Sequence, residues 1–161
     1  MKFIICDIDN CISDDYHRLH LIQDHPSGIR WARYHMYHKA CIQDKADFIK
    51  EMQYPRSFQI HFISGMPEEY RAIRLKWFMK HGRKPGENLL HLRPTFNDYR
   101  PAVEFKRAVM IDLLTRLFNP EDVHACYDDR REIVQMYNDL GLPGVHRAIH
   151  DEEFLYHATG K

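Results

Sequence analysis

The sequence has no long hydrophobic run, no excess of charge of either sign and no low-complexity region. None of its apolar stretches approaches the roughly 20 residues that cross a bilayer, which excludes a helical membrane protein. Basic and acidic residues number 23 each, whereas proteins that bind long nucleic acids along the backbone usually have a basic excess. The balance disfavours that class but leaves room for a local basic groove. With 44% hydrophobic and 12% aromatic residues, the 161-residue chain is expected to form one globular domain.

Common cysteine, histidine and nucleotide-binding motifs are also absent. The four cysteines have no Cys-x-x-Cys spacing and the twelve histidines include no His-Glu-x-x-His pair, so neither a disulfide framework nor a zinc site is expected. No P-loop is present, so a kinase or ligase partner would be a separate protein, and no motif indicates an obligate protein partner. No signal-peptide pattern follows Met1, and we expect a cytoplasmic protein.

Two aspartates, Asp7 and Asp9, follow the first hydrophobic run at residues 3–6. That run is typical of a buried strand, and at this spacing both carboxylates can turn toward one point where the strand ends. Like charges this close raise each other's pKa unless a cation or a basic side chain compensates them. The pair therefore predicts a divalent metal, a nearby lysine and chemistry on an anionic substrate.

Strands and helices are predicted to alternate along the rest of the chain. After the first strand, further strands are expected at residues 58–63, 88–92, 123–127 and 145–149, and helices at 43–53, 67–81, 101–118 and 132–140. This alternation is typical of an α/β fold, with a mostly parallel sheet between two layers of helices. Ligands in such folds bind outside the carboxyl ends of the strands.

Three predicted strands end in chemically useful side chains: Asp7 and Asp9, then Ser64, then Asp128 and Asp129. The apolar face of the predicted helix 101–118 extends back to Lys106, which places this lysine toward the same sheet edge. Alone, Lys106 is better explained as a surface lysine with a packed stem. Its coincidence with three polar strand ends favours a functional site instead.

These residues resemble the four motifs of the haloacid dehalogenase superfamily of phosphotransferases, in the same order along the chain. Asp7-Ile8-Asp9-Asn10-Cys11 resembles the first motif, Ser64 the second, Lys106 the third and Asp128-Asp129 the fourth. The resemblance implies a three-layer, Rossmann-like parallel sheet with a small cap inserted after the first strand, at about residues 13–42.

The resemblance also implies a role for each residue. Asp7 would attack phosphorus to form an aspartyl-phosphate, and Asp9 would act as general acid and then as general base. Mg²⁺ would be held by Asp7, the Asp9 carbonyl and Asp128, with Asp129 ligating or positioning. Ser64 and Lys106 would bind the phosphoryl oxygens or balance their charge.

A finer resemblance is to the 3′-phosphatase domain of bacteriophage polynucleotide kinase/phosphatases. It covers most of the chain, notably the stretches at residues 77–82, 92–94, 99–101 and 128–141. It implies a phosphate contact from Arg18. Gly65, Arg93 and Arg100 are further candidate substrate contacts, with Arg93 or Arg100 as a candidate replacement for the arginine that the family has at position 66. The family's Gly-Thr is replaced here by Asn10-Cys11, its arginine after Ser-Gly by Met66, and its aspartate before the lysine by Ala102. The replacements at positions 66 and 102 raise a small phosphomonoester as an alternative substrate.

Three interpretations of function therefore stay open. The first is a Mg²⁺-dependent phosphatase acting on a nucleic-acid 3′-end or a nucleotide. The second is a 5′-nucleotidase acting on free mononucleotides, which the neutral net charge also fits. The third is a silent binding module, which complete retention of the motif residues disfavours. The aromatic residues between 29 and 38 could stack on a nucleobase, although packing between cap and core is the commoner use of such a stripe.

Overall fold

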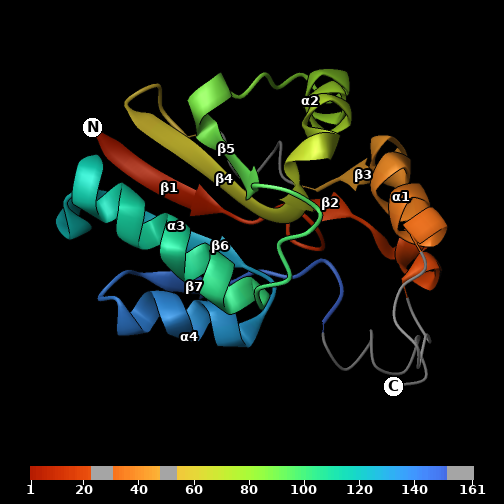
Figure 1. The fold of residues 1–161 in the computed structure, drawn as a ribbon. Coiled ribbons are helices and arrows are strands. Elements are labelled where there is room, and N and C mark those ends of the chain that lie inside the picture. The colour runs from red at the N-terminus through yellow and green to blue at the C-terminus, as the bar shows by residue number, and fades with distance from the viewer. Residues whose placement is uncertain (23–30, 48–53, 152–161) are drawn as a thin grey trace.

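The computed structural model describes residues 1–22, 31–47 and 54–151 of the chain (Figure 1). The strands are β1 Lys2–Cys6, β2 Ser13–Asp14, β3 Lys45–Ala46, β4 Phe58–Pro67, β5 Leu90–Arg93, β6 Val123–Asp128 and β7 Gly144–His146. The α-helices are α1 Trp31–Lys39, α2 Arg71–Lys80, α3 Ala102–Arg116 and α4 Arg131–Asp139. Short 3₁₀ helices are η1 Tyr16–Leu21, η2 Ala40–Gln43, η3 Glu68–Tyr70, η4 Glu87–Leu89 and η5 Pro120–Asp122.

The central sheet has five parallel strands in the order β5-β4-β1-β6-β7. Strand β1 is central and almost wholly apolar, as expected for a strand that is covered on both faces. It pairs with β4 through Ile4↔Ile60 and with β6 through Cys6↔Tyr127. The carboxyl ends of β1, β4 and β6 therefore lie next to one another at one edge.

Side chains of β1 alternate between two hydrophobic clusters, one on each face of the sheet. Ile4 and Cys6 belong to the cluster that contains Trp77 and Phe78 of α2. Ile5 belongs to the opposite cluster, formed largely by α3, α4 and β6. Figure 1 shows the result as three layers, with α2 on one side of the sheet and α3 and α4 on the other.

A small subdomain lies between β1 and β4, beyond the carboxyl edge of the sheet (Figure 1). The antiparallel pair β2–β3, with Ser13↔Ala46 and Asp14↔Lys45, forms its base, and η1, α1 and η2 lie between these strands. Ile12 and Cys41 join it to the α2 side of the core. It includes most of the predicted cap at residues 13–42, and its role as a cap stays a prediction.

The predicted α/β fold class is confirmed, with the expected order of strands and helices from residue 58 onward. The predicted helix 43–53 is wrong where it can be judged, because Lys45 and Ala46 are a strand held by pairing with Asp14 and Ser13. Tertiary pairing overrides helical spacing there, and residues 48–53 lie outside the described residues. The last strand ends at His146 rather than Ile149, whose N–H donates instead to the Asn10 carbonyl (2.8 Å). In the described parts of the chain, no helix has the length and apolar character needed to cross a bilayer.

Candidate active site

An acidic cluster with one buried lysine lies at the carboxyl edge of the sheet. Asp7 follows β1, Asp128 ends β6 and Asp129 is the next residue; carboxylate oxygens of the three lie within 4.8 Å of one another. Lys106 Nζ, from α3, donates to Asp7 Oδ1 (2.7 Å) and Asp128 Oδ2 (2.6 Å). The Asp7 N–H donates to the Tyr127 carbonyl (2.9 Å), which fixes the ends of β1 and β6 side by side. The structure thus brings together four residues that the sequence predicted at one site.

The electrostatics of this cluster follow from burial and from like charges. Burial and the Asp128 carboxylate raise the pKa of Asp7 well above its ordinary value, although Lys106 opposes them. Burial raises the pKa of Asp129 to about 6. Burial alone lowers the pKa of Lys106, but Asp128 and Asp7 outweigh it and hold that pKa well above its ordinary value. The cluster holds more carboxylates than ammonium groups, so a further cation would stabilise it.

The donor set fits Mg²⁺, which prefers carboxylate and other oxygen ligands in proteins. Asp7, Asp128 and Asp129 each offer an oxygen to one point. The remaining oxygen of Asp128 accepts from the Arg130 N–H (3.0 Å), which orients that carboxylate. The Asp9 side chain does not belong to this set, and its predicted contribution to the metal is limited to its backbone carbonyl.

Asp9 instead meets two buried arginines. Arg18 and Arg74 each donate to Asp9 Oδ1 at 2.6 Å. Arg18 is further fixed by Asp44, which accepts from its Nε (2.9 Å) and Nη2 (2.7 Å), and by the Tyr37 carbonyl (3.2 Å). Arg18, predicted to contact phosphate, is thus fully engaged with protein acceptors in this structure. A phosphate contact from it stays a prediction that requires an exchange of partners.

The two guanidinium groups also set the charge of Asp9. Burial alone raises the pKa of Asp9, but Arg74 and Arg18 outweigh it and lower that pKa to about 2. Asp9 is therefore a carboxylate in this structure. To act as a general acid, its side chain would first have to leave both arginines.

Arg74 and Asp44 were missed by sequence reasoning. Arg74 lies on the same face of α2 as Trp77 and Phe78 and is fully buried. The same argument that singled out Lys106 on the apolar face of its helix could have found Arg74 as well. Asp44 carries no such signal, because it lies in a short irregular segment between η2 and β3.

The site also includes residues from β4 and β5, namely Ser64, Gly65 and Arg93. Ser64 is buried, and its Oγ accepts from the Met66 N–H (3.1 Å), which leaves its hydroxyl proton available as a donor. Arg93, at the end of β5, donates from Nε to the Gly65 carbonyl (3.0 Å) and from Nη1 to the Arg100 carbonyl (2.6 Å). Arg93 therefore places its guanidinium beside the second motif, where Met66 itself offers no charge.

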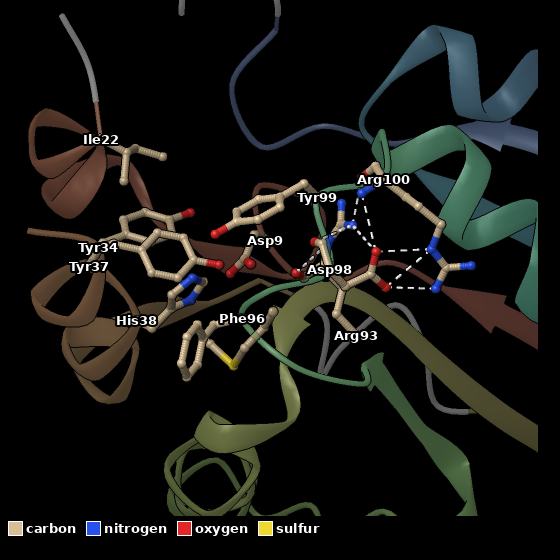
Figure 2. Close-up of a pocket in the computed structure, with 12 residues that line it drawn as sticks. Asp9, Ile22, Tyr34, Tyr37, His38, Arg93, Phe96, Asp98, Tyr99 and Arg100 are labelled. Atoms are coloured by element: carbon tan, nitrogen blue, oxygen red, sulfur yellow. Dashed lines mark hydrogen bonds and ion pairs between the residues drawn. The ribbon is translucent and has the colours of Figure 1, made fainter. Parts of the chain in front are cut away.

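A cavity of about 710 Å³ opens next to these groups (Figure 2). Figure 2 shows Asp9 between two walls: Tyr34, Tyr37 and His38 of α1 on one side, and the arginines Arg93 and Arg100 on the other. Phe96, Tyr99, Met66, Gly65, Asp98 and Ile22 complete the lining. Among the predicted substrate contacts, Gly65, Arg93 and Arg100 line this cavity, and Arg18 does not.

Charge and aromatic rings are divided between the two walls. Arg100 is held by Asp98, which accepts from its Nε (2.9 Å) and Nη2 (2.6 Å). Tyr99 is 76% exposed, so its ring face is open to solvent at the cavity. His38 is buried against Tyr70 (ring centroids 4.7 Å apart), and burial lowers its pKa to about 3, so it is neutral. Of the aromatic residues predicted to stack, Tyr34, Tyr37 and His38 reach the cavity lining, and the side chain of Trp31 lies outside the described residues.

The sequence matches no protein-family model and no curated protein. Among solved structures, a chain from the Pnkp1/Rnl/Hen1 RNA repair complex has a TM-score of 0.63 at 21% identity, over 92% of this chain and 43% of that one. A second structure of the Pnkp1/Rnl/Hen1 complex gives a TM-score of 0.63 at 22% identity, over 91% and 45%. A protein described as a beta-phosphoglucomutase from Thermotoga maritima gives 0.57 at 14% identity, over 99% and 92%. The chain has the haloacid dehalogenase-like fold.

The present chain spans less than half of the length of the two chains it matches in the Pnkp1/Rnl/Hen1 structures. At these levels of identity the comparisons establish the fold alone. Within that haloacid dehalogenase-like fold, the acidic cluster occupies the carboxyl edge of the sheet, where ligands bind in open α/β sheets.

Proposed function

We propose that the protein is a Mg²⁺-dependent phosphomonoesterase that removes phosphate from a nucleic-acid 3′-end or a nucleotide. The observation that carries the proposal is the cluster of Asp7, Asp128 and Asp129 with the buried Lys106 at the carboxyl edge of the sheet. Buried like charges destabilise a fold that does not use them. A silent binding module is therefore disfavoured.

Asp7 is proposed as the nucleophile, because Lys106 orients its carboxylate at the edge of the cluster. Its attack on phosphorus would form an aspartyl-phosphate while the alcohol of the substrate leaves. A bound Mg²⁺ would neutralise the phosphate and reduce its repulsion of the carboxylates. Lys106 and the hydroxyl of Ser64 would stabilise charge on the phosphoryl oxygens.

Asp9 is proposed to protonate the leaving oxygen and then to deprotonate the attacking water. Its contacts with Arg18 and Arg74 would have to break before this step. A phosphate dianion that enters the site would compete with Asp9 for these guanidinium groups. Their transfer to phosphate would remove the two cations that keep Asp9 ionised, so that Asp9 could take up a proton from solvent and then donate it to the leaving oxygen.

The aromatic and cationic walls of the cavity support a nucleotide as the leaving group. A nucleobase can stack on exposed aromatic rings such as Tyr99, while Arg93 and Arg100 offer positive charge for a phosphate of the strand. A 5′-nucleotidase acting on free mononucleotides is the second candidate. Met66, an uncharged residue in the cavity lining next to the Ser-Gly of the second motif, favours it over strand binding.

The test is phosphate release by the purified protein with Mg²⁺, from a 3′-phosphorylated oligonucleotide and from a panel of 3′- and 5′-mononucleotides. We expect release from the oligonucleotide, and none from the Asp7→Asn variant on any substrate. Release from 5′-mononucleotides alone would select the nucleotidase. Absence of any release that depends on Asp7 would overturn the proposed substrate class.

A further inference from the structure

Asn10 occupies an unusual backbone position directly after the first motif. Its φ is +58°, and it is the only non-glycine residue with a positive φ in the parts of the chain that the structure describes. This left-handed conformation is costly for most side chains but is tolerated by asparagine and glycine. The backbone alone would therefore be satisfied by glycine. The asparagine side chain must be explained by its own contacts.

Those contacts fix the direction in which the Asn10 amide points. Its Oδ1 accepts from the His150 N–H (2.9 Å), and its Nδ2 donates to the His150 carbonyl (2.8 Å) and to Asp129 Oδ2 (3.1 Å). A flipped amide would place oxygen against two acceptors and nitrogen against a donor, so only one orientation satisfies the group. Asn10 as a whole is 5% exposed, so it is largely shielded from solvent that would compete for these bonds.

The Asn10 amide therefore holds one carboxylate of the acidic cluster. Asp128 is already oriented by Lys106 and the Arg130 N–H, and Asp7 by Lys106. For Asp129, the donor is the uncharged amide of Asn10. Its hydrogen bond restricts the orientation of the Asp129 carboxylate without adding charge to the site. A neutral donor orients a ligand while leaving its negative charge available to a cation.

We propose that Asn10 is a positioning residue for the metal site, and that it couples the chain at residues 149–150 to Asp129. The proposal rests on the proposed function, because it concerns the same site. The Asn10 carbonyl accepts from the Ile149 N–H (2.8 Å), so both its backbone and its side chain bind this segment. The Asn10 side chain contacts His150 and Asp129 and does not line the cavity, so its proposed action on the metal site is through Asp129.

The test is the affinity of the full chain for Mn²⁺ alone, measured by calorimetry and by the electron paramagnetic resonance of free Mn²⁺. Asn10→Gly keeps the left-handed backbone and removes only the amide. Loss of such a supporting hydrogen bond typically weakens metal binding about 10- to 100-fold, which is the expected result. Circular dichroism of the same samples checks that the variant is folded.

A double-mutant cycle separates positioning through Asp129 from a general structural role. Asp129→Asn removes one proposed carboxylate ligand and is expected to weaken Mn²⁺ binding by itself. If Asn10 acts through Asp129, adding Asn10→Gly to Asp129→Asn should weaken Mn²⁺ binding by less than threefold further. Asn10→Gly binding within twofold of wild type, or an equal loss of affinity in both backgrounds, would overturn the positioning role. Wild-type protein that binds no Mn²⁺ would overturn the metal site itself, and with it the proposed function.

Discussion

Replacement of Lys106 by methionine tests the electrostatic basis of the site. The ammonium lies 2.7 Å from Asp7 Oδ1 and 2.6 Å from Asp128 Oδ2, and its side chain is 4% exposed. Methionine keeps most of the packing volume and removes the charge. Because both partners are buried, breaking such a pair is expected to reduce the free energy of unfolding by about 3–5 kcal/mol. For a domain of this size, that corresponds to a melting temperature lower by roughly 6–20 °C.

The assay is thermal unfolding followed by circular dichroism, with EDTA and then with saturating Mg²⁺. We expect Mg²⁺ to raise the melting temperature of Lys106→Met more than that of wild type, because the variant leaves the carboxylates without their cation. Affinity for Mg²⁺ should not fall, whereas phosphatase turnover should be lost. Lys76→Met, on the exposed face of α2, is the matched control and should melt within about 2 °C of wild type.

Two results would refute this reasoning. A metal-free Lys106→Met variant as stable as the control would show that the lysine does not balance the carboxylates. A loss of Mg²⁺ affinity would show that Lys106 supports the metal rather than competing with it. The double variant Asp7→Asn/Lys106→Met provides a further check, since removal of one carboxylate should recover part of the lost stability.

Other predictions concern individual side chains. Asp7→Asn should abolish phosphate release with little loss of stability by circular dichroism, and surviving activity would exclude Asp7 as nucleophile. Tyr99→Ala should raise KM for an oligonucleotide about 5- to 100-fold through lost stacking. Tyr99→Phe keeps the aromatic ring and should have a KM close to that of wild type. Arg74→Met removes one cation from Asp9 and should raise its pKa; because a general acid must be protonated, the alkaline limb of the kcat/KM pH profile should shift to higher pH. Burial, and then the Asp9 carboxylate, raise the pKa of Asp15 from 3.8 to about 7. Its contribution to stability is therefore full below pH 4 and lost as the pH rises through 7, by at most about 4 kcal/mol. In denaturant unfolding, the free energy of unfolding of wild type should therefore fall relative to that of Asp15→Asn as the pH rises from 4 to above 7.

The core of the fold could be predicted because its signals are local. The predicted strands at residues 3–6, 58–63 and 123–127 are each followed by a polar residue, and Ile133, Met136 and Tyr137 form one buried face of α4. The strand ends then follow from topology, which brings Asp7 and Asp128 to one edge without any knowledge of side-chain contacts. Lys106 could be identified because it extends the apolar face of its helix toward the same sheet edge as three polar strand ends.

The region between β1 and β4 could not be predicted in the same way. Its elements are short, and the pairing of Ser13 with Ala46 joins residues far apart in sequence. Asp9 shows the same limit at the site: its position in the motif indicates a general acid, but its partners come from η1 and α2. Only the assembled structure shows that Arg18 and Arg74 hold it as a carboxylate.

The short β2–β3 pair has a consequence for how this protein can diversify. Because Ser13 and Ala46 lie opposite each other, the chain segment between them begins and ends at a single place on the core. The entropic cost of closing a loop grows only slowly with its length, so a longer or shorter segment can replace this one without a change in the sheet. Such an exchange would replace Tyr34 and Tyr37 in the cavity wall and, with them, Arg18 on Asp9. Selection for a different leaving group would then also act on Arg18, a residue that sets the charge of Asp9, the proposed proton donor.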